Sequence, residues 1–89
     1  MKGLKMTVRT WHIVTITPKG VFIDQRFRRG FKEDFPTDIS NEAADILAFL
    51  TNDGQNGSYV IKDLGYELKQ PNITRHVQEL LDKQLVIVR

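Results

Sequence analysis

The stretch ITRHVQELLDKQLV, residues 73–86, decides the fold because the spacing of its apolar residues changes partway along. They first recur every three or four residues, which is the spacing of one face of a helix. Leu85 then opens an uninterrupted apolar run to Val88, which predicts a strand. The stretch therefore predicts a helix followed directly by a terminal strand. The residues expected on its buried face are Ile73, Val77, Leu80, Leu81 and Gln84.

Two further helices are expected before this one. Ser40 is a suitable N-cap for the first, which should end near residues 52–54. Ser58 is a suitable N-cap for the second, which must stop before Pro71 because the residue preceding a proline avoids the helical region. Pro71 itself suits the first turn of the third helix. The buried stripes are Ala43, Ile46, Leu47 and Leu50 in the first helix and Ile61, Leu64 and Leu68 in the second.

The first third of the chain predicts strands instead. Residues 8–16 and 21–27 are rich in β-branched and aromatic side chains, and TPKG at 17–20 separates them. Proline followed by glycine fits a three-residue hairpin loop with a bulge. We therefore expect an α+β fold in which an N-terminal β-hairpin is followed by a three-helix core and a C-terminal strand. The terminal strand is a candidate third member of the hairpin's antiparallel sheet.

Length and composition exclude several classes of protein. A chain of 89 residues is one domain, 1–89, with a small core. It has no cysteine and two histidines, and we find no phosphate loop or paired nucleophile and base, so we expect neither an enzyme nor a cofactor or metal site. No apolar run approaches the ~20 residues that span a bilayer. With no secretory signal visible, we expect a cytoplasmic protein that binds no membrane.

The charge is unevenly distributed. The net charge of the chain is +2, but residues 1–32 carry net +7 and residues 33–57 carry net −6. Such asymmetry indicates either a polyanionic partner or electrostatic pairing within the molecule. The acidic segment has no cation-loop spacing and reads as a solvated stretch that caps a helix.

Residues 40–88 resemble a winged helix-turn-helix domain of the MarR and ArsR kinds. The similarity rests on residues 73–86, where a Thr-Arg pair is followed by a leucine and an exit that ends in Leu-Val. Three features depart from that pattern. The spacing around Gly65 is about two residues off, Gln84 stands where the family usually has glycine, and the chain stops where the second wing strand should follow. We expect the basic hairpin subregion, residues 1–35, to substitute for this wing beside the winged helix-turn-helix at 40–89.

The resemblance implies that the protein is a small transcriptional regulator that binds a specific site on double-stranded DNA. It also implies that the third helix lies in the major groove. The side chains on the outer face of that helix are of types that read base edges. Glu79 and Asp82 follow on the same face and would repel phosphates. The expected base-reading residues are Gln70, Asn72, Thr74, Arg75 and Gln78. The expected phosphate-binding residues are Lys19, Arg26, Arg28, Arg29 and Lys32.

Other interpretations stay open. The polar face of the third helix could be an ordinary solvent-exposed surface that binds nothing. Winged helices also serve as protein-interaction modules for transcription or replication partners. Single-strand binding through the N-terminal aromatic residues would require exposed rings. We expect these rings to lie in the core instead. A homodimer of the chain is a further possibility. No small-molecule effector is implied. The aromatic residues concerned are Trp11, Phe22, Phe27, Phe31 and Phe35.

Overall fold

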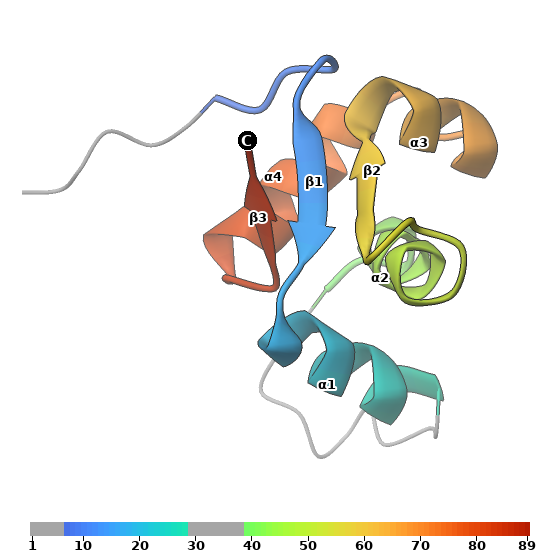
Figure 1. Ribbon diagram of the computed structural model, residues 1–89, viewed down its shortest axis with the longest axis vertical. Helices are drawn as coiled ribbons and strands as arrows, with labels where there is room; N and C mark the ends of the chain where they lie inside the picture. The colour runs from blue at the N-terminus through green and yellow to red at the C-terminus, as the bar shows by residue number, and fades with distance from the viewer. Residues whose placement is uncertain (1–6, 29–38) are drawn as a thin grey trace, which may run out of the picture.

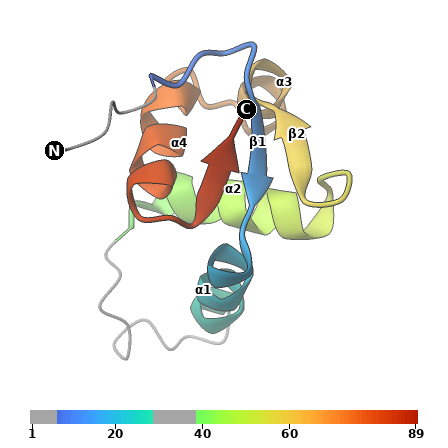
Figure 2. The same cartoon turned by 60° about the vertical axis from the view of Figure 1, so that its left-hand side comes forward.

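The computed structural model describes residues 7–28 and 39–89, which form four helices and three strands (Figure 1). Three of the helices cover one face of the sheet, and the fourth, α1, lies at the end of the first strand (Figures 1 and 2). The elements in chain order are β1 (Ile13–Ile16), α1 (Pro18–Arg28), α2 (Asn41–Asn52), β2 (Ser58–Val60), α3 (Ile61–Leu68), α4 (Ile73–Asp82) and β3 (Val86–Val88).

The sheet is antiparallel, with the strand order β2-β1-β3. The first strand of the chain is therefore the central one, with Val14 opposite Tyr59 on one side and Val88 on the other. Ile13 of β1 and Arg89, which follows β3, exchange two backbone hydrogen bonds of 3.0 and 2.9 Å. The α+β class is confirmed, and so is the pairing of the terminal strand with the N-terminal strand.

The second strand of the predicted N-terminal hairpin, residues 21–27, is not a strand. Residues 18–28 form helix α1, and the strand that was expected over 8–16 is shorter, at 13–16. Thr17 caps the helix, because its Oγ1 accepts a hydrogen bond from Gly20 N–H at 3.1 Å. Pro18 follows at the first helical position, where its lack of an N–H costs nothing. The TPKG sequence therefore starts a helix instead of turning a hairpin.

Ser58 is also not the predicted helix cap. Residues 58–60 form strand β2, and α3 begins at Ile61 without a side-chain cap. Its first two N–H groups are instead bound by the N-terminal segment, since Ile61 N–H donates to His12 O at 2.9 Å and Lys62 N–H donates to Thr10 O at 2.8 Å. This arrangement satisfies helix N–H groups that otherwise lack partners. It fixes residues 10–12 beside the start of α3.

The predicted helical core is confirmed except at Gln84 and at Leu68 and Leu81, which are only half-buried. All four residues expected on the buried side of α2 are buried, and Ser40 caps this helix by accepting a hydrogen bond from Ala43 N–H. On α4, Leu81 is half-buried, and Gln84 is exposed and lies beyond the end of the helix. Strands β1 and β3 contribute Val14 and Val86 to the same core. The remaining core members from the last two helices are Ile61, Leu64, Ile73, Val77 and Leu80.

The exit of α4 forms without the glycine that the resemblance leads one to expect. Gln84 adopts φ 62°, in the left-handed region. Its N–H donates to Leu81 O at 3.0 Å, and Leu85 N–H donates to Leu80 O at 3.0 Å. These two bonds are those of a Schellman motif, which ends a helix by satisfying its last carbonyl groups. The chain is thereby directed into β3.

Among residues 7–28 and 39–89, no helix has the length and apolar character needed to cross a bilayer.

Candidate nucleic-acid interface

Helices α3 and α4 are joined by a turn of four residues, 69–72. Lys69 takes the left-handed conformation there, with φ 54°, and the N–H of Gln70 donates to Gly65 O at 2.9 Å. Gly65 is therefore not the residue that makes the turn. It lies inside α3, where a Cβ atom would come within 3.0 Å of Ile73 Cγ2. Its role is to let α3 and α4 approach closely.

The first turn of α4 presents three of the five expected base-reading residues. Asn72 and Arg75 are exposed, and Thr74 between them is half-buried. All three belong to the start of the helix, because Asn72 is its N-cap residue. An amide, a hydroxyl and a guanidinium therefore lie within one turn, and these groups can donate hydrogen bonds to base edges or phosphates.

The two expected glutamines are held within the molecule. Gln70 Nε2 donates to Glu42 O on α2 at 3.1 Å. Gln78 Nε2 donates to Asp82 Oδ1 at 3.2 Å, and its Oε1 accepts a hydrogen bond from Val8 N–H at 3.4 Å. Val8 is itself buried, so the N-terminal segment covers part of this helix face. Both glutamines thus position neighbouring segments of the chain.

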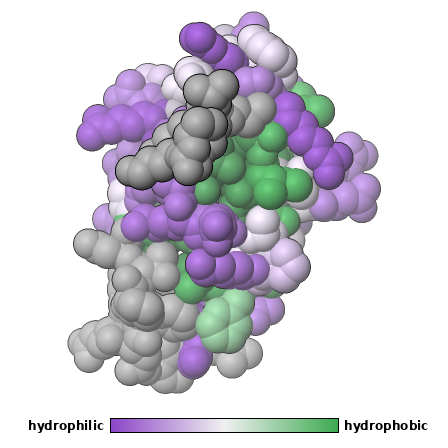
Figure 3. Space-filling view, turned by 90° about the vertical axis from the view of Figure 1, so that its left-hand side faces the viewer, coloured by the Kyte–Doolittle hydropathy of each residue, from purple (hydrophilic) through white to green (hydrophobic). Residues whose placement is uncertain are grey.

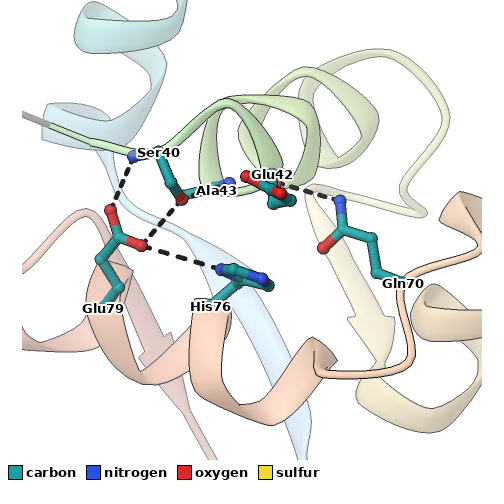
Figure 4. A network of polar contacts seen from close by, with 6 residues as sticks. All are labelled: Ser40, Glu42, Ala43, Gln70, His76 and Glu79. Carbon is teal, nitrogen blue, oxygen red and sulfur yellow. Dashed lines mark hydrogen bonds and ion pairs between the residues drawn. The ribbon is translucent and has the colours of Figure 1, made fainter.

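Glu79 lies one helical turn after Arg75 and lines the same surface pocket, as expected, but its carboxylate is engaged with α2. Its carboxylate accepts hydrogen bonds from Ser40 N–H and Ser40 Oγ, both at 2.9 Å (Figure 4). His76 Nδ1 lies 3.9 Å from the same carboxylate. A negative charge is favourable at the N-terminus of α2, where unpaired N–H groups concentrate positive potential. This carboxylate is directed at α2 instead of at a polyanion beside the first turn of α4.

The N-terminal segment contributes to the same end of the molecule. Residues 9–12 form a turn in which His12 N–H donates to Arg9 O at 3.1 Å and Arg9 N–H donates to His12 Nδ1 at 2.9 Å. His12 is buried, whereas Trp11 is 71% exposed, with its ring centroid 4.0 Å from that of His12. The expectation that Trp11 lies in the core is wrong: Arg9, Thr10 and Trp11 are all exposed in this turn, and His12 is its buried residue.

A cleft of about 610 Å³ lies between the turn at residue 10, α3 and the start of α4. Tyr66, which is 72% exposed, lies on it with two lysines. Lys62 and Tyr66 lie one turn apart on one face of α3, and Lys69 follows the end of that helix. Sequence reasoning missed this face, although the predicted buried stripe of α3 already left it on the outside. The lining residues are Thr10, Lys62, Gly65, Tyr66, Lys69, Gln70, Pro71 and Ile73.

Two of the expected phosphate-binding residues, Lys19 and Arg26, belong to a different region. Lys19 is exposed and Arg26 half-buried on α1, where the Arg26 guanidinium lies 5.2 Å from the centroid of the Phe22 ring. Phe22 is 51% exposed, which corrects its predicted place in the core. The side chain of Arg28 lies outside the described part of the structure. The same holds for the side chain of Phe27 and for residues Arg29, Phe31, Lys32 and Phe35.

Helix α1 is attached at the exit of α4, at the opposite end from Asn72. Thr17 Oγ1 donates to Gln84 O at 2.9 Å, and Thr17 N–H donates to Leu85 O at 3.0 Å. Figures 1 and 2 show α1 at the far end of β1 from α3. The structure therefore does not bring Lys19 and Arg26 together with the first turn of α4.

Comparison with known proteins adds no relative to this description: no protein-family model, curated protein or solved structure matches the chain.

Proposed function

We propose that this protein binds double-stranded DNA as a winged-helix regulator, with the first turn of α4 in the major groove. The observation that carries the proposal is the exposure of Asn72 and Arg75 on a helix that follows a four-residue turn. A second helix that follows such a turn is the reading element of helix-turn-helix proteins, and its N-terminal residues contact base edges.

The sheet supports this interpretation. In the winged-helix pattern, a strand follows the reading helix and pairs with a second wing strand. Here β3 follows α4, and β1 pairs with it in antiparallel orientation. The N-terminal strand thus takes the place that the second wing strand has in that pattern. The residues near the tip of this divided wing are those of the turn at 9–12, together with Arg89.

The distribution of charge supports a polyanionic partner at this end of the molecule. Arginines and lysines from four segments are exposed around α3 and the start of α4. The carboxylates of Asp63 and Glu67 come from α3 positions that lie off the face shared by Lys62 and Tyr66. Cations that neutralise phosphates supply most of the sequence-independent affinity for DNA. These exposed cations are Arg9, Lys62, Lys69, Arg75 and Arg89.

The test is the affinity for labelled duplex DNA, measured by fluorescence anisotropy at several salt concentrations. Arg75→Ala should weaken binding and reduce the slope of log affinity against log salt by about one if the guanidinium contacts a phosphate. If it pairs with guanine, the loss should be confined to selected sites, at about 1–3 kcal/mol. Lys19→Ala, on α1, is the matched control and should change neither quantity if only the α3–α4 end binds.

The same titration tests the phosphate contacts first expected at the basic N-terminal third. An Arg28→Ala/Arg29→Ala double variant should lower the salt slope if α1 lies along the DNA, and it should leave the slope unchanged if only the α3–α4 end binds. Absence of duplex binding by the wild-type protein at low salt would overturn the proposed function.

A protein-interaction module remains the second candidate, and one observation favours it. The sheet face opposite the core exposes Ile13, Val60 and Ile87. Figure 3 shows hydrophobic surface, bordered by hydrophilic side chains, on the side of the molecule where β3 lies. Exposed apolar patches are typical of protein contacts, including those with a second copy of the same chain. Light scattering of the wild type and of Ile87→Lys would detect such a homodimer.

A further inference from the structure

We infer that the cleft beside Tyr66 binds an unpaired nucleotide, so that the protein recognises duplex DNA next to a single-stranded segment. This inference extends the proposed function, because it adds a contact beside the duplex-reading turn of α4. It rests on three features of the cleft: its aromatic wall, its charge and its position.

The aromatic wall is the ring of Tyr66. It is 72% exposed at the rim of a cleft of about 610 Å³, a volume within the range of sites that hold drug-sized ligands. The ring is therefore accessible to a ligand in the cleft. Every base has an aromatic face, so an exposed ring stacks on unpaired bases with little regard to sequence.

The charge of the cleft fits a nucleotide. Lys62 lies one helical turn before Tyr66 on α3, and Lys69 is the residue that follows this helix; both are exposed and line the cleft. No carboxylate is among the residues that line the cleft in the described part of the chain. An aromatic ring between two ammonium groups is the pattern that binds a base together with its flanking phosphates.

The floor of the cleft is formed by Gly65, Ile73 and the turn between α3 and α4. A side chain at Gly65 would meet Ile73 Cγ2 at 3.0 Å and Gln70 O at 3.3 Å, so the glycine keeps this floor low. Thr10 closes the other side, held there by the hydrogen bond from Lys62 N–H to its carbonyl oxygen. The cleft is thus built from three segments that are fixed to one another.

The position of the cleft links it to the duplex-reading residues. Pro71, in its lining, immediately precedes Asn72 at the start of α4. A duplex whose major groove holds the first turn of α4 would place its backbone near this cleft. A strand that leaves the duplex at that point could continue past Tyr66. Continuous duplex has no unpaired base to offer and would leave the ring unstacked.

The experiment compares three labelled DNAs by fluorescence anisotropy: a blunt duplex, the same duplex with a thymidine tail of about five nucleotides, and the tail strand alone. We expect the tail to raise affinity about tenfold, since one stacked base contributes roughly 5- to 150-fold. Tyr66→Ala should remove this gain while leaving binding to the blunt duplex within about twofold, and Tyr66→Trp should keep the gain. Phe22→Ala, which removes an exposed ring on α1, is the matched control and should retain it.

The outcomes separate this inference from the proposed function. Equal affinity for blunt and tailed duplex, or a gain that persists in Tyr66→Ala, overturns the inference and leaves duplex binding in place. Binding of single strands that depends on Tyr66, without binding of the blunt duplex, supports the cleft and overturns the proposed function. No binding to any of the three DNAs overturns both. Circular dichroism of each variant checks that the fold is retained.

Discussion

Two helices of this protein end on left-handed residues that are not glycine. Lys69 follows α3 with φ 54°, and Gln84 follows α4 with φ 62°. The left-handed conformation costs a residue with a Cβ atom about 1–2 kcal/mol, because the Cβ approaches the following carbonyl oxygen. The backbone hydrogen bonds of each helix end hold these residues in place despite that cost. Such positions can be improved by substitution.

Gln84→Gly should therefore stabilise the protein. Glycine adopts the left-handed conformation without a steric penalty, and the bonds to Leu80 and Leu81 do not involve the Gln84 side chain. We expect the free energy of unfolding to rise by about 0.5–1 kcal/mol, measured by chemical denaturation. Lys83→Gly is the control, since Lys83 has φ −94° and its replacement should only destabilise. A lower stability of Gln84→Gly would contradict this account of the helix end.

At the scale of elements, the start of α2 is attached to α4 by a single carboxylate. Glu79 binds both the N–H and the hydroxyl group of Ser40, while Ser40 Oγ accepts a hydrogen bond from Ala43 N–H (Figure 4). The cap of one helix is thus also a contact with the other. Ordinary N-cap preferences should fail at this position, because a second carboxylate would face Glu79.

Ser40→Asp should destabilise the protein by about 1–3 kcal/mol relative to Ser40→Asn, although both residues are good N-caps. The physical reason is repulsion between two carboxylates at hydrogen-bond distance. Thermal and urea unfolding at neutral pH measure the difference. Adding Glu79→Gln to Ser40→Asp should recover most of the loss, and equal stability of the Asp and Asn variants would show that Glu79 does not act on the cap.

The start of α1 is packed against the exit of α4, and Gly20 makes this possible. A Cβ atom at Gly20 would overlap the carbonyl oxygen of Leu85 and the side chain of Ile16. Gly20→Ala should therefore destabilise by about 1–3 kcal/mol or more, although alanine is the better helix former. Lys19→Ala, at the exposed neighbouring position, should leave stability within about 0.5 kcal/mol, as denaturation curves would show.

The elements that could be predicted are those whose periodicity is decisive. The apolar residues of α2 and α4 recur at helical spacing, so these helices and the strand after α4 followed from the sequence. The sequence predicted a strand where helix α1 lies, because Val21, Phe22 and Ile23 favour strands by composition. The Thr17-Pro18 pair was the available signal for a helix start. Ser58 was predicted to cap a helix, but its segment is extended because it pairs with the distant strand β1. No local pattern could have indicated that pairing.

At the scale of the whole molecule, the strand order does not follow the order of the chain. Strand β1 lies between β2 and β3, and the backbone groups of Ile13 and Arg89 are joined by hydrogen bonds. The candidate site depends on this arrangement, since it combines the turn at 9–12, α3 and the start of α4. Asn72, Thr74 and Arg75 could be predicted from their helix alone, whereas the cleft could not, because no local pattern brings Thr10 beside Tyr66.

A circular permutant tests whether the chain order matters to the fold. The permuted chain starts at residue 39, continues to Arg89, passes through a linker of about six glycine and serine residues, and ends with residues 7–38. We expect the same far-ultraviolet circular dichroism as the parent, and a stability within about 2 kcal/mol of it, because the new connection joins segments that already lie together. A permuted chain that stays unfolded would show that the native connection between α1 and α2 is required.

The central position of β1 also has a consequence for how the protein acquires its structure. Its partners are about 45 and 72 residues away along the chain, by the registers Val14 to Tyr59 and Thr15 to Ile87. Contacts between such distant segments slow folding, because a long loop must close before any contact forms. During synthesis, β1 can pair with β2 only after residue 60 has been made, and with β3 only after residue 88. Until then its apolar residues lack their strand partners, a condition that favours aggregation.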